Sequence, residues 1–109
     1  MTPEKRKKAY QALLQELSGV GWISEGYAQN RGPGAGGPCF QWTRKVKGKT
    51  VSVALSEEQF EALAKAIETW QKTKQILKRM QQLSREEIFT TLPGTKRRKR
   101  LGKKVLGLI

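Results

Sequence analysis

The sequence predicts an α+β domain with a basic, disorder-prone tail, and three observations lead to this prediction. An apolar stripe at helical spacing lies close to the N-terminus. Two runs in which apolar and polar residues alternate follow it, and a long stretch of helical periodicity comes next. This order is typical of a helix, an antiparallel sheet and further helices around one core. We place the domain at residues 1–92 and the tail at residues 93–109.

The first helix is predicted over residues 3–18. Thr2 supplies a capping hydroxyl, Pro3 suits the first turn, and Glu4 lies near the positive end of the helix dipole. Four consecutive cations in the first turns oppose that dipole, which indicates either a phosphate contact or a solvated, frayed terminus. These cations are Lys5, Arg6, Lys7 and Lys8.

A β-hairpin is predicted over residues 39–46 and 49–55. Lys47-Gly48 lies between the two runs and predicts a two-residue turn, because Gly adopts a positive φ without a steric clash. A lone hairpin is rarely stable in water, so we expect a third antiparallel strand, for which residues 21–28 are the candidate. The predicted register pairs Val46 with Lys49, Arg44 with Val51, Trp42 with Val53 and Phe40 with Leu55.

That register separates an apolar face from a polar and basic face. All the large apolar groups lie on one side, and a shift by one residue would mix the two faces. The polar side suits phosphates and base edges, although an ordinary solvated sheet face has the same composition. The candidate contacts are Gln41, Thr43, Lys45, Thr50 and Ser52, with Arg44 and Lys49 at the rim and Lys47 at the tip.

The loop at residues 29–38 is rich in Gly and Pro but lacks the spacing of a nucleotide-binding glycine motif. Arg31 within this loop would contact a nucleic-acid backbone if the loop reaches one. Cys39 is the only cysteine, and the chain contains no His and no Asp. Neither a zinc site nor an acid–base constellation can be assembled from this composition, so we expect no enzymatic activity, no cofactor and no metal.

A long helix is predicted over residues 57–83 and a short helix over residues 85–92. The tetrapeptides at 56–59 and 84–87 both have the spacing of a capping box, which marks a helix start. The apolar seam of the long helix indicates packing on the sheet and the first helix, or self-association along the helix. This seam comprises Phe60, Leu63, Ile67, Trp70 and Leu77, and Lys74 interrupts it.

The charge of the chain indicates a polyanionic partner. Lys and Arg number 22 against nine acidic residues, which gives a formal net charge of +13. No stretch is apolar enough to cross a membrane and the first residues do not resemble a signal peptide, so we expect a cytoplasmic protein associated with the nucleoid or with ribonucleoprotein. The densest basic block, which we expect to bind phosphates non-specifically, comprises Lys96, Arg97, Arg98, Lys99, Arg100, Lys103 and Lys104.

The run from Gly37 to Phe89 resembles a family of small bacterial and archaeal domains of unknown function that are associated with mobile genetic elements. The phrase that carries the resemblance is Gly-Pro-Cys-Phe-Gln-Trp-Thr-Arg-Lys-Val-Lys-Gly-Lys-Thr-Val-Ser-Val-Ala-Leu-Ser-Glu-Glu-Gln, and the helix ending Met-Gln-Gln-Leu-Ser also fits. Many relatives have a cysteine-rich loop with a His before the Gly-Pro, whereas this chain has only Cys39 there. The predicted order of elements is also similar to the arm-type DNA-binding domains of tyrosine recombinases, which place a three-stranded sheet in the major groove.

These observations predict a non-catalytic nucleic-acid-binding protein, an accessory subunit of a mobile-element nucleoprotein complex that contains DNA or structured RNA. A ribosome-associated role in RNA binding belongs to the same class. The alternative is a helical adaptor for a larger transposase or nuclease, in which the basic tail serves only as an anchor. A larger protein subunit, or a second copy held along the helix at 57–83, would then be the partner.

Overall fold

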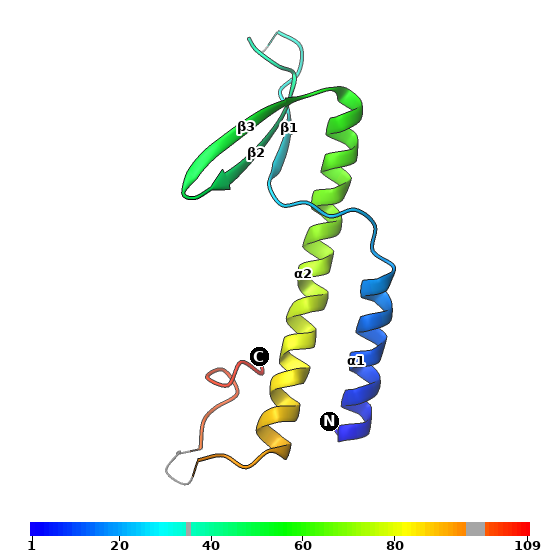
Figure 1. Cartoon of the computed structure of the whole chain (residues 1–109), viewed down its shortest axis with the longest axis vertical. Helices are drawn as coiled ribbons and strands as arrows, with labels where there is room; N and C mark the ends of the chain where they lie inside the picture. Colours follow the sequence, from blue (N-terminus) through cyan, green and yellow to red (C-terminus); the bar gives the residue numbers. More distant parts are fainter. Residues whose placement is uncertain (35, 96–99) are drawn as a thin grey trace. The chain divides into compact units, whose positions relative to one another are not determined.

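The computed structural model describes residues 1–34, 36–95 and 100–109, and it has the predicted α+β architecture (Figure 1). Its elements are α1 (Pro3–Ser18), β1 (Tyr27–Asn30), β2 (Phe40–Val46), β3 (Lys49–Leu55) and α2 (Glu57–Thr91). The chain forms two compact units. One unit contains Met1–Gly19 and Lys74–Ile109, and the other contains Val20–Thr73.

Helix α1 begins and ends at the predicted residues. The hydroxyl of Thr2 accepts a hydrogen bond from the backbone N–H of Lys5 at 3.2 Å, and Pro3 occupies the first turn, where its missing N–H costs nothing. At the other end, the backbone N–H of Gly19 donates to the carbonyl of Glu16. Local capping chemistry therefore accounts for both limits of this helix.

The hairpin has the predicted register, from the Val46–Lys49 pair beside the turn to the Phe40–Leu55 pair at the open end. Lys47 and Gly48 both have positive φ, at 51° and 80°, as a type I′ turn requires. Strand β2 is central, and β1 pairs with it antiparallel on the side away from β3. The sheet is therefore the three-stranded antiparallel sheet that was expected.

The first strand lies further along the chain than the predicted 21–28 and is only four residues long. The residues before it are held by other contacts, since the backbone N–H of Ser24 donates to the carbonyl of Ala66 in α2 at 3.2 Å. Gly26 then takes a φ of 110°, which redirects the chain into the sheet. Trp22, which falls within the predicted 21–28, lies outside the strand and is 92% exposed.

The predicted break between helices at residues 83–85 is wrong, because α2 continues from Glu57 to Thr91. Ser84 does not act as a cap. Its hydroxyl donates to the carbonyl of Met80, one turn back, at 2.8 Å, which is the bond of a serine inside a helix. No Gly or Pro lies between residues 57 and 91 to stop the helix. The capping-box spacing at 84–87 therefore falls inside a continuous helix and does not mark a helix start.

The real capping box lies at the start of α2. The backbone N–H of Gln59 donates to the hydroxyl of Ser56 at 3.1 Å, and the side-chain oxygen of Gln59 accepts from the backbone N–H of Ser56 at 3.0 Å. Both reciprocal bonds of the motif are present. The turn from β3 into α2 is therefore defined by the sequence at that point.

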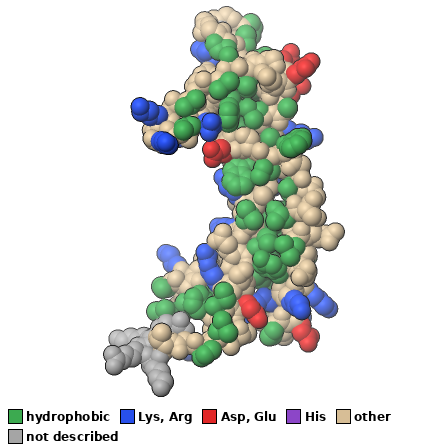
Figure 2. Space-filling model, in the orientation of Figure 1, with side chains coloured by type: hydrophobic (Ala, Val, Ile, Leu, Met, Phe, Trp, Pro, Cys, Tyr) green, Lys and Arg blue, Asp and Glu red, His purple; other side chains and the backbone are tan. Residues whose placement is uncertain are grey.

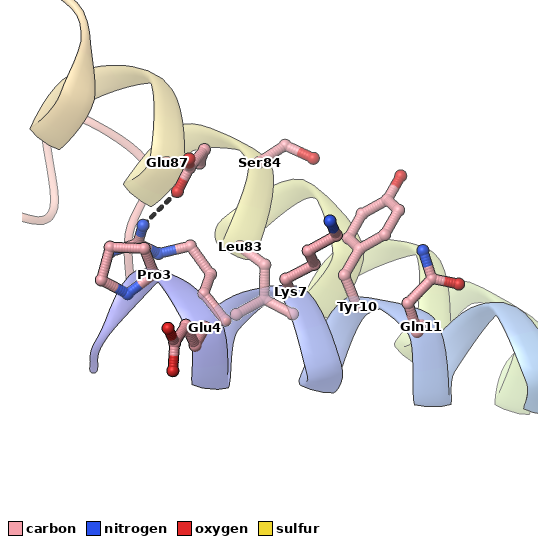
Figure 3. Close-up of a pocket in the computed structure, with 9 residues that line it drawn as sticks. Pro3, Glu4, Lys7, Tyr10, Gln11, Leu83, Ser84 and Glu87 are labelled. Atoms are coloured by element: carbon pink, nitrogen blue, oxygen red, sulfur yellow. Dashed lines mark hydrogen bonds and ion pairs between the residues drawn. The ribbon is translucent and has the colours of Figure 1, made fainter.

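In the first unit, α1 runs antiparallel to the second half of α2 (Figure 1). Leu83 is the most buried residue there, at 1% exposed, and Arg6 is 5% exposed. The guanidinium of Arg6 forms ion pairs with Glu86, at 3.6 Å, and with Glu87. Figure 3 shows this second ion pair at one end of a cavity of about 390 Å³ between the two helices. The lining residues are Pro3, Glu4, Arg6, Lys7, Tyr10, Gln11, Leu83, Ser84 and Glu87.

The closing residues of the chain belong to the same unit. A turn over residues 103–107 places the carbonyl of Gly107 3.2 Å from the guanidinium of Arg85, which donates to it. Leu106 and Leu108 are half-buried, whereas Val105 and Ile109 are exposed. Residues 100–109 of the predicted tail are thus folded back on α2 at this point, which differs from the disorder-prone tail that the sequence predicts.

In the second unit, the apolar face of the sheet contacts the beginning of α2 through Phe40. The rings of Phe40 and Phe60 lie with their centroids 5.0 Å apart, and Leu55 is half-buried beside the same strand end. Towards the turn the cover ends, because Val51 is 37% exposed and Val53 is 42% exposed. The apolar face predicted from the register is therefore covered at the Phe40 end and exposed at Val51 and Val53.

Candidate nucleic-acid interface

The sheet has a second face, and we call it the open face. Residues that pair directly across an antiparallel sheet point to the same side, so the two registers assign its members. Thr43 and Ser52 lie on this face, and their hydroxyls interact at 3.4 Å. The open face comprises Tyr27 and Gln29 of β1, Gln41, Thr43 and Lys45 of β2, and Thr50, Ser52 and Ala54 of β3.

The side chains of the open face form rows across the strands. One row consists of Tyr27, Thr43 and Ser52, and the next consists of Gln29, Gln41 and Ala54. Lys45 and Thr50 form a further row nearer the turn, beyond the reach of the short β1. The row that contains Tyr27 is thus aromatic and hydroxylic, while the row near the turn contains the cation Lys45.

Tyr27 was not among the predicted contacts, although it is 63% exposed on this face. The predicted strand at residues 21–28 includes Tyr27, but no register for its pairing with the hairpin could be predicted, so the face of the ring could not be assigned. The signal was present in the alternation of Tyr27 and Gln29 with Ala28, which has the period of a strand. Only the pairing of Tyr27 with Thr43 shows which face the ring shares.

A contact between Trp42 and the chain before β1 positions this strand. The indole N–H of Trp42 donates to the carbonyl of Glu25 at 3.0 Å. Gly26 follows and leaves room for the indole, since a Cβ at that residue would lie 2.3 Å from the indole nitrogen. The backbone is therefore held before Gly26 by this bond and after Gly26 by the pairing of Tyr27 with Thr43.

The charged residues of the segment that forms the sheet are all positive. Residues 27–55 contain five cations and no carboxylate, and the cations are Arg31, Arg44, Lys45, Lys47 and Lys49. The acids of the same unit lie outside this segment, at Glu25 and on α2. Figure 2 shows blue side chains at the tip of the hairpin, where Lys47 and Lys49 are exposed. The second unit is thus polarised, with its positive end on the sheet.

Two of the predicted rim residues lie on the opposite face. The register places Arg44 and Lys49 on the side of Trp42, and the guanidinium of Arg44 lies over the Trp42 ring at 5.1 Å from its centroid. A cation over an indole is held by the negative face of the ring. The prediction that Arg44 borders the open face is therefore wrong, because its side chain is half-buried against Trp42.

The basic first turns of α1 divide into two kinds of residue. Arg6 is buried and neutralised by Glu86 and Glu87, so the suggestion that it contacts phosphate is wrong. Its neighbours Lys5, Lys7 and Lys8 are exposed. They belong to the first unit, whereas the open face belongs to the second.

The remaining predicted contacts lie in the loop and in the tail. The guanidinium of Arg31 donates to the carbonyl of Gly36 at 3.4 Å, inside the Gly/Pro-rich loop. Arg100, Lys103 and Lys104 are exposed. The other predicted tail contacts lie outside the described residues, and they are Lys96, Arg97, Arg98 and Lys99.

Within the described ranges, no three residues among His, Cys, Asp and Glu are grouped so that they could hold a metal ion. The helices over the same ranges include none with both the length and the apolar character needed to span a bilayer. Comparison with family models, with curated proteins and with solved structures found no match to this chain. The function is therefore argued from the chemistry of the described side chains.

Proposed function

We propose that this protein binds nucleic acid without catalysing a reaction, through the open face of its sheet. The observation that carries the proposal is the charge of residues 27–55, which include five cations and no acid, with Lys45 exposed on the open face and Lys47 exposed at the tip of the hairpin. A carboxylate anywhere on this surface would repel a phosphate backbone. Such a one-signed surface is typical of proteins that bind polyanions.

Each kind of side chain on the face has a use in such binding. Lys45 and Lys47 neutralise phosphates, and this gives affinity that falls with salt. The small hydroxyls of Thr43, Thr50 and Ser52 let a backbone approach closely and donate to phosphate or sugar oxygens. Gln41 carries an amide, which both donates to and accepts from base edges.

The block at residues 96–104 would add phosphate contacts of its own. It has seven cations and no aromatic residue, so it has charge but nothing to stack on bases. We expect it to raise affinity for every nucleic acid alike and to steepen the salt dependence by slightly under one log–log unit for each contact. The open face, by contrast, would account for preferences between nucleic acids.

Charge reversal on the full-length chain tests the open face. We expect Lys45→Glu and Thr43→Glu to weaken binding to labelled oligonucleotides, measured by fluorescence anisotropy, and to lower the salt slope. Lys65→Glu is the matched control for Lys45→Glu, because Lys65 is exposed on α2 in the same unit and the change in net charge is identical. Equal losses in the two lysine variants would mean that binding follows net charge alone, and the sheet would then be a scaffold.

The resemblance of residues 37–89 adds a context, in which the protein is a small subunit of a mobile-element nucleoprotein complex. An accessory subunit needs a protein contact as well as a nucleic-acid contact. The exposed Val51 and Val53 supply an apolar strip on the side of the hairpin opposite the open face. Val53→Gln, which removes apolar surface without changing the net charge, should then abolish co-purification of a protein partner and leave oligonucleotide binding unchanged.

A further inference from the structure

We infer that the open face binds single-stranded nucleic acid and that Tyr27 stacks on one of its bases. The inference rests on the proposed function and adds the class of nucleic acid that the face selects. The inference is based on the position of Tyr27. This aromatic residue belongs to a strand that is paired in the sheet, and its side chain is exposed to solvent.

The surroundings of Tyr27 leave its ring accessible. Thr43 and Ser52 continue its row across the sheet, and both side chains are too short to cover a phenol ring. Tyr27 remains 63% exposed in consequence. An exposed aromatic ring on a polar sheet face is the platform on which single-stranded bases stack, and every base has a π-face to offer.

The backbone beneath the ring is held in place. Trp42 bonds the carbonyl of Glu25, and the close approach at Gly26 leaves the chain little freedom just before Tyr27. A tyrosine on a fixed backbone loses few conformations on binding, so more of the stacking energy appears as affinity.

The rest of the open face fits the other parts of a single strand. Gln41 and Gln29 occupy the row next to Tyr27, and their amides match the Watson–Crick edges of bases, which are exposed only in unpaired strands. Lys45 lies towards the hairpin tip, within the cationic end of the sheet, where backbone phosphates would pass. The three rows of the open face would therefore bind base edges through Gln29 and Gln41, a base plane through Tyr27, and a phosphate through Lys45.

A duplex would not satisfy the same residues. Its bases are already stacked on one another, and inserting a ring between them costs a few kcal/mol of unstacking. Its Watson–Crick edges are occupied by the complementary strand. A ribbon lying in the major groove would leave the Tyr27 ring without a base to stack on, so we expect the open face to discriminate against duplexes.

The experiment compares a labelled 12-mer of thymidine, a 12-mer of uridine and a 12-base-pair DNA duplex, each titrated with the full-length chain at one salt concentration. We expect Tyr27→Ala to weaken binding to the single strands by about tenfold or more. Tyr27→Phe keeps the ring and should bind within about twofold of the unchanged chain, by the same stacking argument. Duplex affinity, which the basic block supplies, should be the same in all three proteins. The thymidine and uridine arms separate a preference for DNA from one for RNA.

Two further variants keep the test decisive. Tyr27→Thr introduces a β-branched side chain, which favours a strand as Tyr does, and it replaces Tyr27→Ala if circular dichroism shows that the alanine variant unfolds. Trp22→Ala removes another exposed aromatic residue of the same unit, one that lies outside the sheet, and should leave affinity unchanged. If Tyr27→Ala and Tyr27→Thr bind single strands as tightly as the unchanged chain, or if Trp22→Ala is the variant that fails, the stacking role is wrong while the proposed function stands. If the unchanged chain binds none of the three probes, both are wrong.

Discussion

The indole of Trp42 donates its N–H to the backbone carbonyl of Glu25, 3.0 Å away, and this bond ties the entry of β1 to the central strand of the sheet. Trp42 is thereby engaged on two sides, by this carbonyl and by the guanidinium of Arg44. The half-burial of the ring is explained by these contacts. Because β1 bears Tyr27, the geometry of the open face depends on a residue of the opposite face.

The first prediction concerns Gly26, whose backbone lies against that indole. Gly26→Ala should lower the free energy of unfolding by about 1–3 kcal/mol, the cost of a non-glycine residue held in a sparsely populated φ/ψ region. The added Cβ would also lie 2.9 Å from the carbonyl of Thr43. Urea denaturation followed by tryptophan fluorescence measures the change. Gly21→Ala is the matched control, since nothing lies within 4 Å of a Cβ built there, and a loss as large as that of Gly26→Ala would contradict the prediction.

The second prediction concerns the buried charge of Arg6. Replacing both of its partners, in Glu86→Gln/Glu87→Gln, should cost about 3–5 kcal/mol, because it leaves a buried cation without a counter-charge. Arg6→Met should cost less. The carboxylates are partly exposed and can be hydrated, and the Nε of Arg6 is itself buried without a hydrogen-bond partner among the described residues. Thermal denaturation ranks the stabilities of the two variants. If Arg6→Met is the less stable one, leaving the two carboxylates without the cation costs more than leaving the cation without the carboxylates, and the prediction is wrong.

The third prediction contrasts the two serines that share a capping-box spacing. Ser56→Ala should destabilise the protein by about 1 kcal/mol, because it removes the acceptor for the Gln59 N–H at the start of α2. Ser84→Ala should change stability by less than about half of that, since Ala is the better residue inside a helix. Chemical denaturation of both variants checks the contrast. A larger cost at Ser84 would indicate that its bond to Met80 matters more than helix propensity.

The fourth prediction uses the turn of the hairpin and has two readouts. Lys47 has a φ of 51°, and Asn tolerates this conformation better than Lys. We therefore expect Lys47→Asn to raise the free energy of unfolding by about 0.5 kcal/mol, within the range seen for compatible backbone changes. Because the same change removes a cation from the hairpin tip, it should also lower the slope of log affinity against log salt by slightly less than one unit. A stabilised variant with an unchanged slope would exclude Lys47 from the phosphate contacts.

Several elements follow from the sequence because their causes are local. The limits of α1 depend on Thr2 and Pro3, which lie beside the first turn. The hairpin register depends on Lys47-Gly48 and on a period of two, so that turn chemistry and alternation give the same pairing. The cap of α2 depends on residues three apart. In each case the interacting groups are close in sequence or pair across a single two-residue turn.

The tertiary structure decided the positions of residues whose contacts lie far away in the sequence. Strand β1 begins where it does because Ser24 bonds to Ala66 and Glu25 bonds to Trp42, and neither contact leaves a pattern in the sequence. Arg6 is one of four consecutive cations, and only its pairing with Glu86 and Glu87 distinguishes it as buried. Tyr27 is likewise assigned to the open face only by its pairing with Thr43. Local propensity cannot assign such residues, because the energy that places them comes from contacts formed only when the chain has folded.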